Sequence, residues 1–402
     1  MTTIVSMGTF SSAFLGCKVS YMDARDIGDR LRAGGLVDAA DAVPDVAFVS
    51  TCCVTHEALR KSRKVARRAA ARAKRVYVTG CAANLRDAMS DLPANVAVVA
   101  GSSEETPDLI AREVGAPACT NASHRHDRVR AFVKIQDGCS FSCAFCVIPS
   151  VRGASRSRSA VSVLDEVRRR VREGHGEIVL SGVNLGCFRD KDAGYDLARL
   201  VRETGSTEGV RRLRLSSIEP NHLTVGLLEA MAGTESAGPH LHVPLQSGDD
   251  RVLAAMQRRY TSGEFLRKVE RAQGFNLTTD VIVGFPNEDD DAFARTLEVV
   301  ERAGITKVHV FPYSPRPGTR TAALDTVLPE VKRERGRRLR AASDAACAQH
   351  WRTKIGETAT VLIDRPGRGY AEDYTPWMLD GPVGAFVRAP GAAVTAEGVR
   401  AA

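Results

Sequence analysis

The sequence has few aromatic residues, with Phe, Trp and Tyr making up 5% of its 402 residues, and no apolar stretch near the ~18 residues that span a bilayer. No basic residue precedes Lys18, so the charged start of a secretory signal peptide is also missing. These absences predict a cytoplasmic protein without a membrane partner, in which thiols stay reduced. The ten cysteines are therefore expected to be buried hydrophobic residues or metal ligands and not a disulfide framework.

The rest of the composition is typical of a globular chain, with 44% hydrophobic and 26% charged residues. The length accommodates two or three domains. Lys and Arg number 56 against 48 Asp and Glu, which gives a net charge of +8. This excess permits a nucleic-acid partner without requiring one.

Residues 1–120 alternate short apolar runs with helical patterns, which predicts an N-terminal parallel α/β domain. The expected strands cover 45–50, 75–79 and 95–99, and the expected helices cover 20–33, 56–73 and 104–114. A polar, irregular stretch at 117–127 is typical of a linker.

Residues 126–350 continue the alternation in a second domain. Six strands are expected to begin near residues 131, 177, 211, 240, 278 and 307. Helical patterns separate or follow them at 162–173, 262–273, 289–303 and 329–350. Six βα units are too few for a closed eight-stranded barrel and favour an open, partial (β/α)6 barrel. Residues 355–402 contain strand-like pieces broken by Gly and Pro, which predicts a small C-terminal β module.

Three cysteines follow the first strand of this barrel, where Cys139, Cys143 and Cys146 have the spacing C-x3-C-x2-C. Zinc sites usually bring four ligands in pairs such as C-x2-C. Three thiolates in one loop instead suit three irons of a [4Fe–4S] cluster and leave the fourth iron open. An open iron can bind S-adenosylmethionine (SAM) and pass on the electron that cleaves it to a 5′-deoxyadenosyl radical. A structural zinc site and three unrelated cysteines are the alternatives.

Polar residues and glycines at the ends of later strands are candidates for binding SAM. Parallel strands place their carboxyl ends on one rim, where polar groups and exposed backbone can hold ribose, carboxylate and adenine. Each position alone is explained equally well as a loop former. The candidates are Gly182, Ser217, Glu219, Gln246, Asp280 and Gly284.

Three further cysteines, Cys17, Cys52 and Cys81, fall at strand-to-helix turns of the first domain. Such turns lie on one edge of a parallel sheet, so the three thiols can converge. A second three-cysteine [4Fe–4S] cluster is one inference, and buried free cysteines account for the spacing equally well. Cys53 is expected to point elsewhere if Cys52 is a ligand. The remaining cysteines are expected to be structural: Cys119, Cys187 and Cys347.

Together these motifs resemble the radical-SAM methylthiotransferase family over nearly the whole chain. The matching segments are 15–19, 50–52, 78–81, 139–146, 148–153, 157–159, 245–248, 256–261 and 281–286. Such enzymes replace C–H by C–SCH3, which implies two SAM molecules, one as methyl donor and one as radical source. The resemblance also implies an auxiliary cluster on Cys17, Cys52 and Cys81 that carries the sulfur.

The segment 308–319 looks most like the family members that methylthiolate threonylcarbamoyladenosine beside the tRNA anticodon. The resemblance thus implies conversion of C2–H to C2–SCH3 in N6-threonylcarbamoyladenosine at tRNA position 37, with the anticodon stem-loop as partner. A donor such as flavodoxin or ferredoxin would supply electrons, the sulfur source is unknown, and a monomer is expected. The second hypothesis is the same chemistry on isopentenyladenosine tRNA, a ribosomal protein, a peptide or a metabolite. The third is a non-catalytic RNA-binding iron–sulfur protein.

Other features bear on RNA binding. Residues 355–402 look like a short TRAM domain, the family's RNA-binding β module. Residues 60–75 carry nine Lys and Arg and no acid, which suits phosphate contact or a solvated helix face. The arginines after the cysteine loop are also expected near substrate phosphates: Arg152, Arg156 and Arg158. The sequence departs from the family pattern at Ser20 and Ser50, where the family has Asn, and at Cys53.

Overall fold

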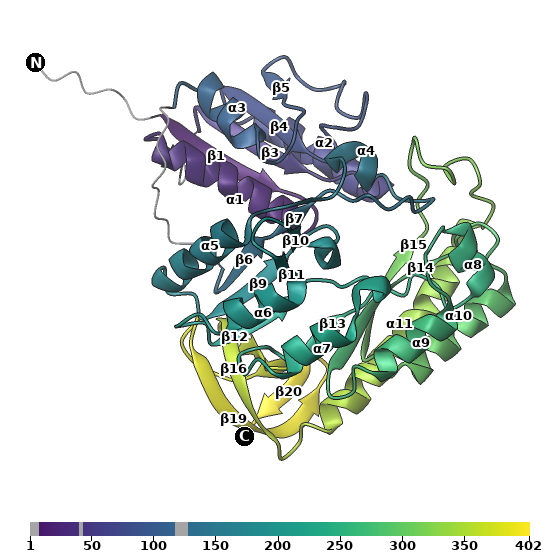
Figure 1. Cartoon of the computed structure of the whole chain (residues 1–402). Helices are drawn as coiled ribbons and strands as arrows, with labels where there is room; N and C mark the ends of the chain where they lie inside the picture. The colour runs from purple at the N-terminus through teal and green to yellow at the C-terminus, as the bar shows by residue number, and fades with distance from the viewer. Residues whose placement is uncertain (1–7, 40–42, 117–127) are drawn as a thin grey trace, which may run out of the picture. The chain divides into compact units, whose positions relative to one another are not determined.

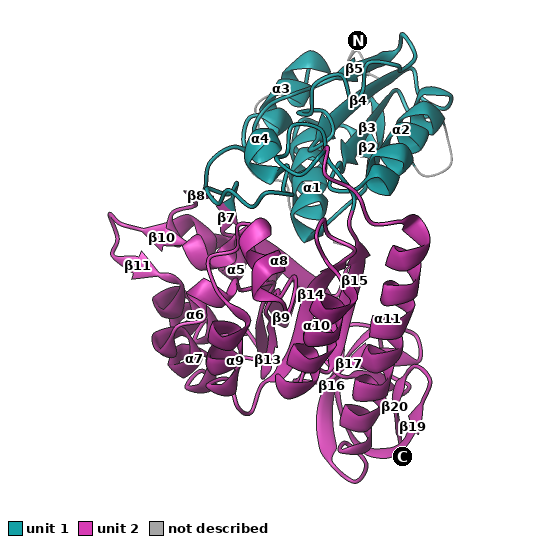
Figure 2. Ribbon diagram, turned by 90° about the vertical axis from the view of Figure 1, so that its right-hand side faces the viewer, with its two compact units in different colours: residues 1–125, 137–155, 314–322 teal, residues 126–136, 156–313, 323–402 magenta. Residues whose placement is uncertain are grey.

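The computed structural model describes residues 8–39, 43–116 and 128–402 (Figure 1). The chain forms two compact units (Figure 2). Unit 1 consists of residues 1–125, 137–155 and 314–322, and unit 2 of residues 126–136, 156–313 and 323–402. The cysteine loop at 139–146 therefore belongs to the same unit as the first domain of the sequence. The division at 1–120, 126–350 and 355–402 stays a prediction, and the linker at 117–127 and Cys119 lie outside the described residues.

Unit 1 is built on a five-stranded parallel sheet in the order β2-β1-β3-β4-β5. Its strands are Thr9–Phe14 (β1), Val37–Asp38 (β2), Val46–Thr51 (β3), Arg75–Gly80 (β4) and Val96–Val98 (β5). The predicted strands are β3, β4 and β5. No bounds were predicted for β1 because its residues, Thr-Phe-Ser-Ser-Ala-Phe, form no apolar run.

Helices cover both faces of this sheet. They are Lys18–Ala33 (α1), His56–Ala70 (α2), Thr106–Glu113 (α3) and Ile148–Arg152 (α4). On one face, Ile27 of α1 and Ile110 of α3 pack against Phe48 of β3. The other face buries residues from α2 and α4 against Val49, the next residue of β3. Successive strand residues point to opposite faces, so a strand buried on both sides is apolar throughout.

Unit 2 contains the predicted six-stranded, partial (β/α)6 barrel. Its parallel strands are Arg130–Lys134 (β6), Glu177–Ser181 (β9), Arg212–Leu215 (β12), His240–His242 (β13), Asn276–Val283 (β14) and Lys307–Pro312 (β15). They form two sheets, β6-β9-β12 and β13-β14-β15, and a parallel bridge from Leu213 to Ala237 links β12 to the start of β13. The predicted α/β fold is confirmed.

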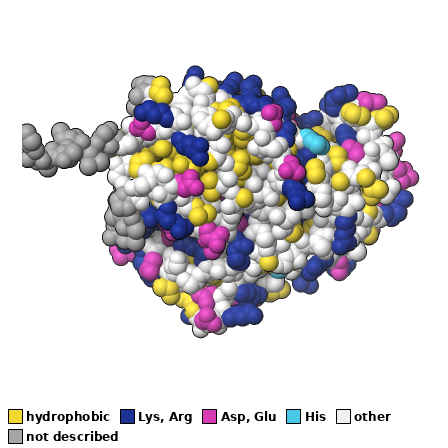
Figure 3. Space-filling model, turned by 90° about the horizontal axis from the view of Figure 1, so that it is seen from above, with side chains coloured by type: hydrophobic (Ala, Val, Ile, Leu, Met, Phe, Trp, Pro, Cys, Tyr) yellow, Lys and Arg dark blue, Asp and Glu magenta, His cyan; other side chains and the backbone are white. Residues whose placement is uncertain are grey.

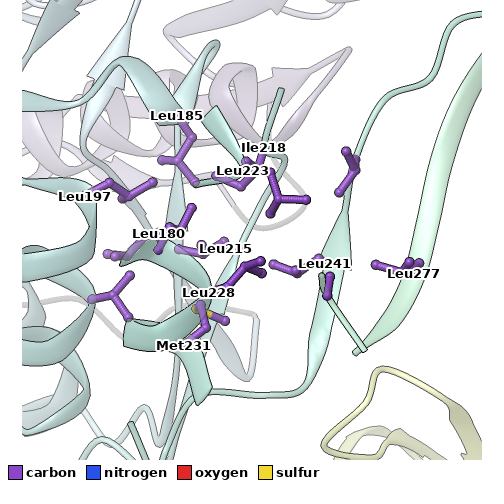
Figure 4. Close-up of a cluster of buried hydrophobic side chains, with 14 of the residues drawn as sticks. Leu180, Leu185, Leu197, Leu215, Ile218, Leu223, Leu228, Met231, Leu241 and Leu277 are labelled. Atoms are coloured by element: carbon purple, nitrogen blue, oxygen red, sulfur yellow. The ribbon is translucent and has the colours of Figure 1, made fainter. Parts of the chain in front are cut away.

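Helices pack on the outer face of this barrel. They are Ala160–Arg172 (α5), Leu197–Gly205 (α6), Val225–Ala232 (α7), Asp250–Ala255 (α8), Ser262–Glu270 (α9), Asp290–Arg302 (α10) and Pro329–Arg352 (α11). Figure 4 shows Leu180, Leu215 and Leu241 of the strands packed in one apolar cluster with Leu228 and Met231 of α7. Along β14, Leu277, Val281 and Val283 join this core. Residues of the alternate register, which include Thr278 and Asp280, therefore point to the inner face of the barrel.

Short elements lie between these strands and helices along the chain. They are Gln136–Asp137 (β7), Arg156–Ser157 (β8), Arg189–Asp190 (β10), Tyr195–Asp196 (β11) and the 3-10 turns Leu185–Cys187 (η1) and Pro220–His222 (η2). Several helices begin after a Ser, Thr or Asp whose side chain accepts a backbone N–H of the first turn, as at Ser159, Thr224 and Asp289. Such caps explain why the predicted helix starts were accurate to a few residues.

The C-terminal residues form a closed five-stranded barrel in the order β16-β17-β18-β20-β19. Its strands are Thr358–Arg365 (β16), Arg368–Tyr370 (β17), Pro376–Met378 (β18), Phe386–Thr395 (β19) and Gly398–Ala401 (β20). Trp377 is fully buried at its centre. This barrel confirms the predicted small β module.

Buried arginines of the larger barrel attach this module within unit 2. Arg214 donates to the carbonyls of Ala371 and Glu372 at 2.6 and 2.8 Å, and Arg212 donates to the carbonyl of Tyr370 at 3.0 Å. Both arginines pair with Glu177, at 3.2 Å for Arg212 and 3.0 Å for Arg214. One carboxylate therefore balances two buried guanidinium groups.

We expect Arg214→Ala to lower the free energy of unfolding by about 3–5 kcal/mol, because removing one partner of a buried ion pair leaves other polar groups without theirs. Equilibrium urea denaturation measures this effect. Arg302→Ala, which removes only an exposed ion pair with Glu298, is the matched control and should unfold near the wild-type midpoint. Equal midpoints for the two variants would show that these contacts do not hold the module.

Candidate functional site

The N-terminal cysteines converge as the sequence predicts. Phe14 of β1 lies opposite Ser50 of β3, and Ser50 lies opposite Thr79 of β4, so the three strands end at one edge of the sheet. Cys17, Cys52 and Cys81 follow these ends. Burial raises the pKa of the Cys81 thiol to about 11; the neighbouring Cys17 and Cys52 contribute to this increase, and Arg152 opposes it. The three thiols thus lie within electrostatic range of one another, while their role as ligands stays a prediction.

Close packing sets the position of Cys52. A side chain at Gly16, which has φ +115°, would meet Cβ of Cys52 at 3.0 Å and its Sγ at 3.2 Å. The hydroxyl of Ser62, from α2, accepts the backbone N–H of Cys52 and donates to its carbonyl, both at 3.0 Å. Ser62 is fully buried. The sequence analysis missed it because a serine within a basic helix carries no signal of its own.

Ser20 and Ser50, two of the three positions where the sequence departs from the resemblance, lie together beside these cysteines. The hydroxyl of Ser50 donates to the backbone carbonyl of Ser20 at 3.3 Å. The hydroxyl of Ser20 lies 3.8 Å from Sγ of Cys17. Both serines are buried, so the packing around Cys17 includes two small polar side chains.

The central cysteine loop has a tightly turned backbone. Gly138 has φ +68°, and a side chain there would collide with the carbonyl of Ala154. The N–H of Cys139 donates to the carbonyl of Gly153 at 3.0 Å, and the N–H of Cys146 donates to the carbonyl of Cys143 at 3.1 Å. Cys139, Cys143 and Cys146 are partly exposed and form no disulfide. These three thiols therefore line one short, ordered loop of unit 1.

Arg152 does not have its predicted place near substrate phosphates. Its guanidinium is buried and pairs with Asp23 at 2.8 Å and with Asp137 at 3.1 Å. Its Nε lies 3.1 Å from Sγ of Cys81. The prediction was wrong because the sequence could not show two acids, one of them 129 residues away, meeting this arginine. Arg152 supplies positive charge to the N-terminal cysteines.

The basic helix α2 is partly neutralised within unit 1. Arg60 pairs with Glu57 at 2.8 Å, and Arg67 pairs with Asp91 at 2.6 Å. Lys64, Arg68 and Arg72 are exposed. Basic side chains gather along the upper edge of the space-filling view in Figure 3. The predicted phosphate-contacting face is thus smaller than the nine positive charges of the sequence implied.

In the described part of the chain, three possible metal-ligand atoms lie within 4.8 Å of one another at His242, Asp280 and His309. The group that the two sets of cysteines hold stays a prediction.

The residues predicted to bind SAM lie in unit 2, and several have structural tasks there. A side chain at Gly182 would meet Oε1 of Gln136 at 2.9 Å, so packing within the protein requires this glycine. Gly284 has φ +71°, and a side chain there would collide with Lys332. The N–H of Gln246 donates to the carbonyl of Asp280 at 2.8 Å. Ser217 is partly exposed after β12. Their contacts with SAM stay predictions.

Two carboxyls of this set lie near each other: Asp280 lies within β14 and not at its end, and Glu219 follows β12. Asp280 lies between His242 of β13 and His309 of β15, each with a ring nitrogen 3.2 Å from a carboxylate oxygen. Although burial opposes it, hydrogen bonds from both imidazoles hold the pKa of Asp280 well below its usual range. Glu219 is paired with Arg258. Burial raises the pKa of Glu219, an effect that Arg258 opposes and Asp280 adds to.

We call His242, Asp280 and His309 the polar wall. The rings of His242 and His309 stack at 5.3 Å, and Nδ1 of His242 lies 2.9 Å from the hydroxyl of Thr278. The sequence analysis identified Asp280 alone. The two histidines come from separate strands, and nothing in their local sequence indicates that they meet.

A buried carboxyl beside Gly284 was also missed. Glu288 accepts the N–H groups of Gly284 and Phe285, the latter at 3.2 Å, and so holds the loop after β14. Burial raises the pKa of Glu288 to about 7, although the positive charge of the nearby Arg335 opposes this increase. The sequence feature that could have pointed to Glu288 is the loop segment Gly284-Phe285-Pro286, which ends two residues before it.

Three further cysteines among the described residues belong to neither set: Cys53, Cys187 and Cys347. Cys53 is buried beside the N-terminal set, and burial, together with the neighbouring Cys81 and Cys52, raises the pKa of its thiol to about 12. Cys347 is buried on α11 and donates to the carbonyl of Thr306 at 2.9 Å. Sγ of Cys187 lies 3.4 Å from Nε2 of His222.

No helix among the described residues is long and apolar enough to cross a membrane.

Two family profiles match the chain. Residues 133–300 match the radical SAM superfamily, and residues 9–101 match a family described as uncharacterized protein family UPF0004. Among solved structures, the radical SAM methyltransferase TsrM from Kitasatospora setae is similar with a TM-score of 0.60 at 12% identity, over 78% of this chain and 75% of that one. At this identity the likeness concerns the fold alone.

Curated relatives match over most of their length. The threonylcarbamoyladenosine tRNA methylthiotransferase MtaB of Chlamydia pneumoniae is 32% identical, covering 94% of this chain and 92% of its own. The protein of the same name from Bacillus subtilis is 34% identical, covering 93% and 91%. The tRNA-2-methylthio-N(6)-dimethylallyladenosine synthase of Solibacter usitatus is 32% identical, covering 82% and 80%.

Proposed function

Because this chain belongs to the radical-SAM methylthiotransferase family, we propose that it converts C2–H of N6-threonylcarbamoyladenosine at tRNA position 37 into C2–SCH3. Relatives named for threonylcarbamoyladenosine and for dimethylallyladenosine both reach 34% identity, so similarity alone does not choose between these substrates. The polar wall of unit 2 supports the first of them.

The two N6 substituents differ in what they offer this wall. A dimethylallyl group is apolar and would cover the carboxylate of Asp280 and two imidazoles without hydrogen bonding to them, which is unfavourable. A threonylcarbamoyl group brings urea N–H groups, a hydroxyl and a carboxylate. Asp280 can accept from N–H or hydroxyl groups. Both ring nitrogens of His242 already face Asp280 and Thr278. Nε2 of His309 is therefore the ring nitrogen that can hydrogen bond with the hydroxyl or carboxylate of the substrate. This match is the observation on which the proposed substrate rests.

The cysteines supply the positions for the family's two clusters. Cys139, Cys143 and Cys146 would hold one [4Fe–4S] cluster, and Cys17, Cys52 and Cys81 the other. When bound, the first supplies the electron that cleaves SAM and the second carries the sulfur. Ser62 and Gly16 hold Cys52 in place, and Arg152 places positive charge beside Cys81. Gly182, Gln246 and Gly284 would shape the SAM-binding rim of unit 2.

RNA binding would use phosphate contacts that are independent of sequence. The candidates in unit 1 are the exposed Lys64 and Arg68 of α2 and the exposed Arg72 just after it. The closed C-terminal barrel is the candidate in unit 2. Recognition of the modified base would then depend on the polar wall.

Nucleosides from a strain that lacks this gene test the proposal. Mass spectrometry should show loss of 2-methylthio-N6-threonylcarbamoyladenosine and accumulation of its precursor, while 2-methylthio-isopentenyladenosine stays at the wild-type level. The reverse pattern would assign the protein to the other substrate. If the purified, reconstituted protein formed no 5′-deoxyadenosine from SAM and dithionite, both enzymatic hypotheses would be wrong.

A further inference from the structure

Arg316 is a fully buried arginine in unit 1. It lies in the segment 314–322, and its exposed fraction is 1%. Its Nε donates to the carbonyl of Pro315 at 2.9 Å, and its Nη1 donates to the carbonyl of Cys53 at 3.0 Å. Its Nη2 is buried and has no hydrogen-bond partner among residues 8–39, 43–116 and 128–402. One face of the guanidinium therefore lacks an acceptor.

The other buried arginines of the described chain all have an acidic partner. Arg170 pairs with Glu166 and Glu173, Arg212 and Arg214 pair with Glu177, and Arg335 pairs with Glu288 and Asp290. In unit 1, Arg152 is likewise neutralised by Asp23 and Asp137. Among the described residues, the hydrogen bonds of Arg316 go only to carbonyl oxygens. A buried cation without a counter-charge is unfavourable, so this position suits an anion that no described acidic residue supplies.

The surroundings of Arg316 indicate which anion that is. The hydrogen bond to the carbonyl of Cys53 places the guanidinium beside the residue that follows Cys52. The thiols of Cys53 and Cys52 are also within electrostatic range of it, since they oppose the lowering of the pKa of Arg316 by burial. Cys52 is one of the three converging cysteines. A [4Fe–4S] cluster with its thiolate ligands carries net negative charge and sulfur atoms that accept hydrogen bonds, and both properties set its potential. The missing partner of Arg316 and the group predicted at Cys52 therefore have complementary charge.

We propose that Arg316 is the counter-charge of the auxiliary cluster at Cys17, Cys52 and Cys81, and that its unpartnered Nη2 donates to a sulfur atom of that cluster. The proposal rests on the proposed function for the presence of the cluster and not for the identity of the RNA. A fixed positive charge stabilises the more negative, reduced state of the cluster. The positive charge of Arg316 therefore raises the reduction potential of the auxiliary cluster.

The test uses full-length protein in which Cys139, Cys143 and Cys146 are all replaced by alanine, so that only the auxiliary cluster is loaded. Reductive titration followed by electron paramagnetic resonance gives its midpoint potential. We expect Arg316→Gln to shift this potential to more negative values, and Arg316→Lys, which keeps the charge, to stay nearer the parent. Arg320→Gln is the matched control, since Arg320 is exposed on the same segment and should change nothing.

The possible results separate this proposal from the proposed function. If the auxiliary cluster of Arg316→Gln has the same midpoint potential as that of the parent protein, the role proposed for Arg316 is wrong and the proposed function is unaffected. An equal shift in the Lys and Gln variants would also overturn it, because charge would not be the cause. A parent protein that binds no iron would contradict the auxiliary cluster itself. Another outcome is that Arg316→Gln loses the auxiliary cluster, which is about four irons per chain. If Arg316→Lys then retains this iron and the midpoint potential of the parent protein, the result supports Arg316 as the counter-charge.

Discussion

Replacing Cys143 with alanine should remove about half of the iron and abolish SAM cleavage, because a fully loaded chain is expected to hold about eight irons in two clusters. Cys143 lies in the tightly turned loop between Gly138 and Gly153, and its carbonyl accepts the N–H of Cys146. Iron analysis after anaerobic reconstitution and chromatography of 5′-deoxyadenosine measure the two effects.

Replacing Cys52 should also remove about half of the iron, yet spare SAM cleavage and stop sulfur insertion. The reason is that Cys52 belongs to the other set of converging cysteines, together with Cys17 and Cys81. Cys347→Ser is the matched control, because Cys347 is buried and its hydroxyl replacement can still donate to Thr306. It should retain all iron. Methylthiolated product from Cys52→Ala would overturn the assigned role of this cysteine, as would equal iron loss in the control.

His309→Leu should lower kcat/KM for RNA that contains threonylcarbamoyladenosine by roughly tenfold or more, since a hydrogen bond to a charged group contributes about 1.5–3 kcal/mol. His309 forms one side of the polar wall and lies 3.2 Å from Asp280. The loss should appear for this RNA and not for RNA with isopentenyladenosine. Competition between the two RNAs, analysed by mass spectrometry of the product nucleosides, measures the selectivity.

The control for this variant lies on the same strand. Lys307→Leu removes an exposed ion pair with Asp344 of α11 and should leave the preference for the two RNAs unchanged. Unchanged selectivity in His309→Leu, or the same change in Lys307→Leu, would show that the polar wall does not choose the substrate.

The sequence allowed much of the fold to be predicted, because the relevant signals are local. Runs such as residues 46–49 are apolar over the length of a short strand, and N-terminal caps such as Asp289 mark helix starts close by in the chain. The cysteine spacings are local too, and parallel pairing alone places Cys17, Cys52 and Cys81 at one sheet edge. No bounds were predicted for β1 because it combines serines with isolated aromatic residues.

The side-chain partners could not be predicted, because they depend on contacts between distant segments. The contact of Arg316 with Cys53 joins residues 263 positions apart. The sequence around either residue gives no sign that the arginine lies beside the turn that carries the cysteine. His309 and Asp280 meet through the register of β14 and β15, where a shift of one residue would turn either side chain to the opposite face. For the same reason Arg152 was placed at the substrate, when Asp23 and Asp137 hold it inside unit 1.

The most direct test of the proposed activity is a reaction of the reconstituted enzyme with SAM, dithionite and two anticodon stem-loop RNAs in equal amounts. One RNA carries threonylcarbamoyladenosine and the other isopentenyladenosine. We predict that mass spectrometry of the digested products shows a methylthio group at C2 of the threonylcarbamoyladenosine and little change in the other nucleoside. A methylthio group on isopentenyladenosine alone, or on neither nucleoside while 5′-deoxyadenosine is formed, would contradict the proposed function.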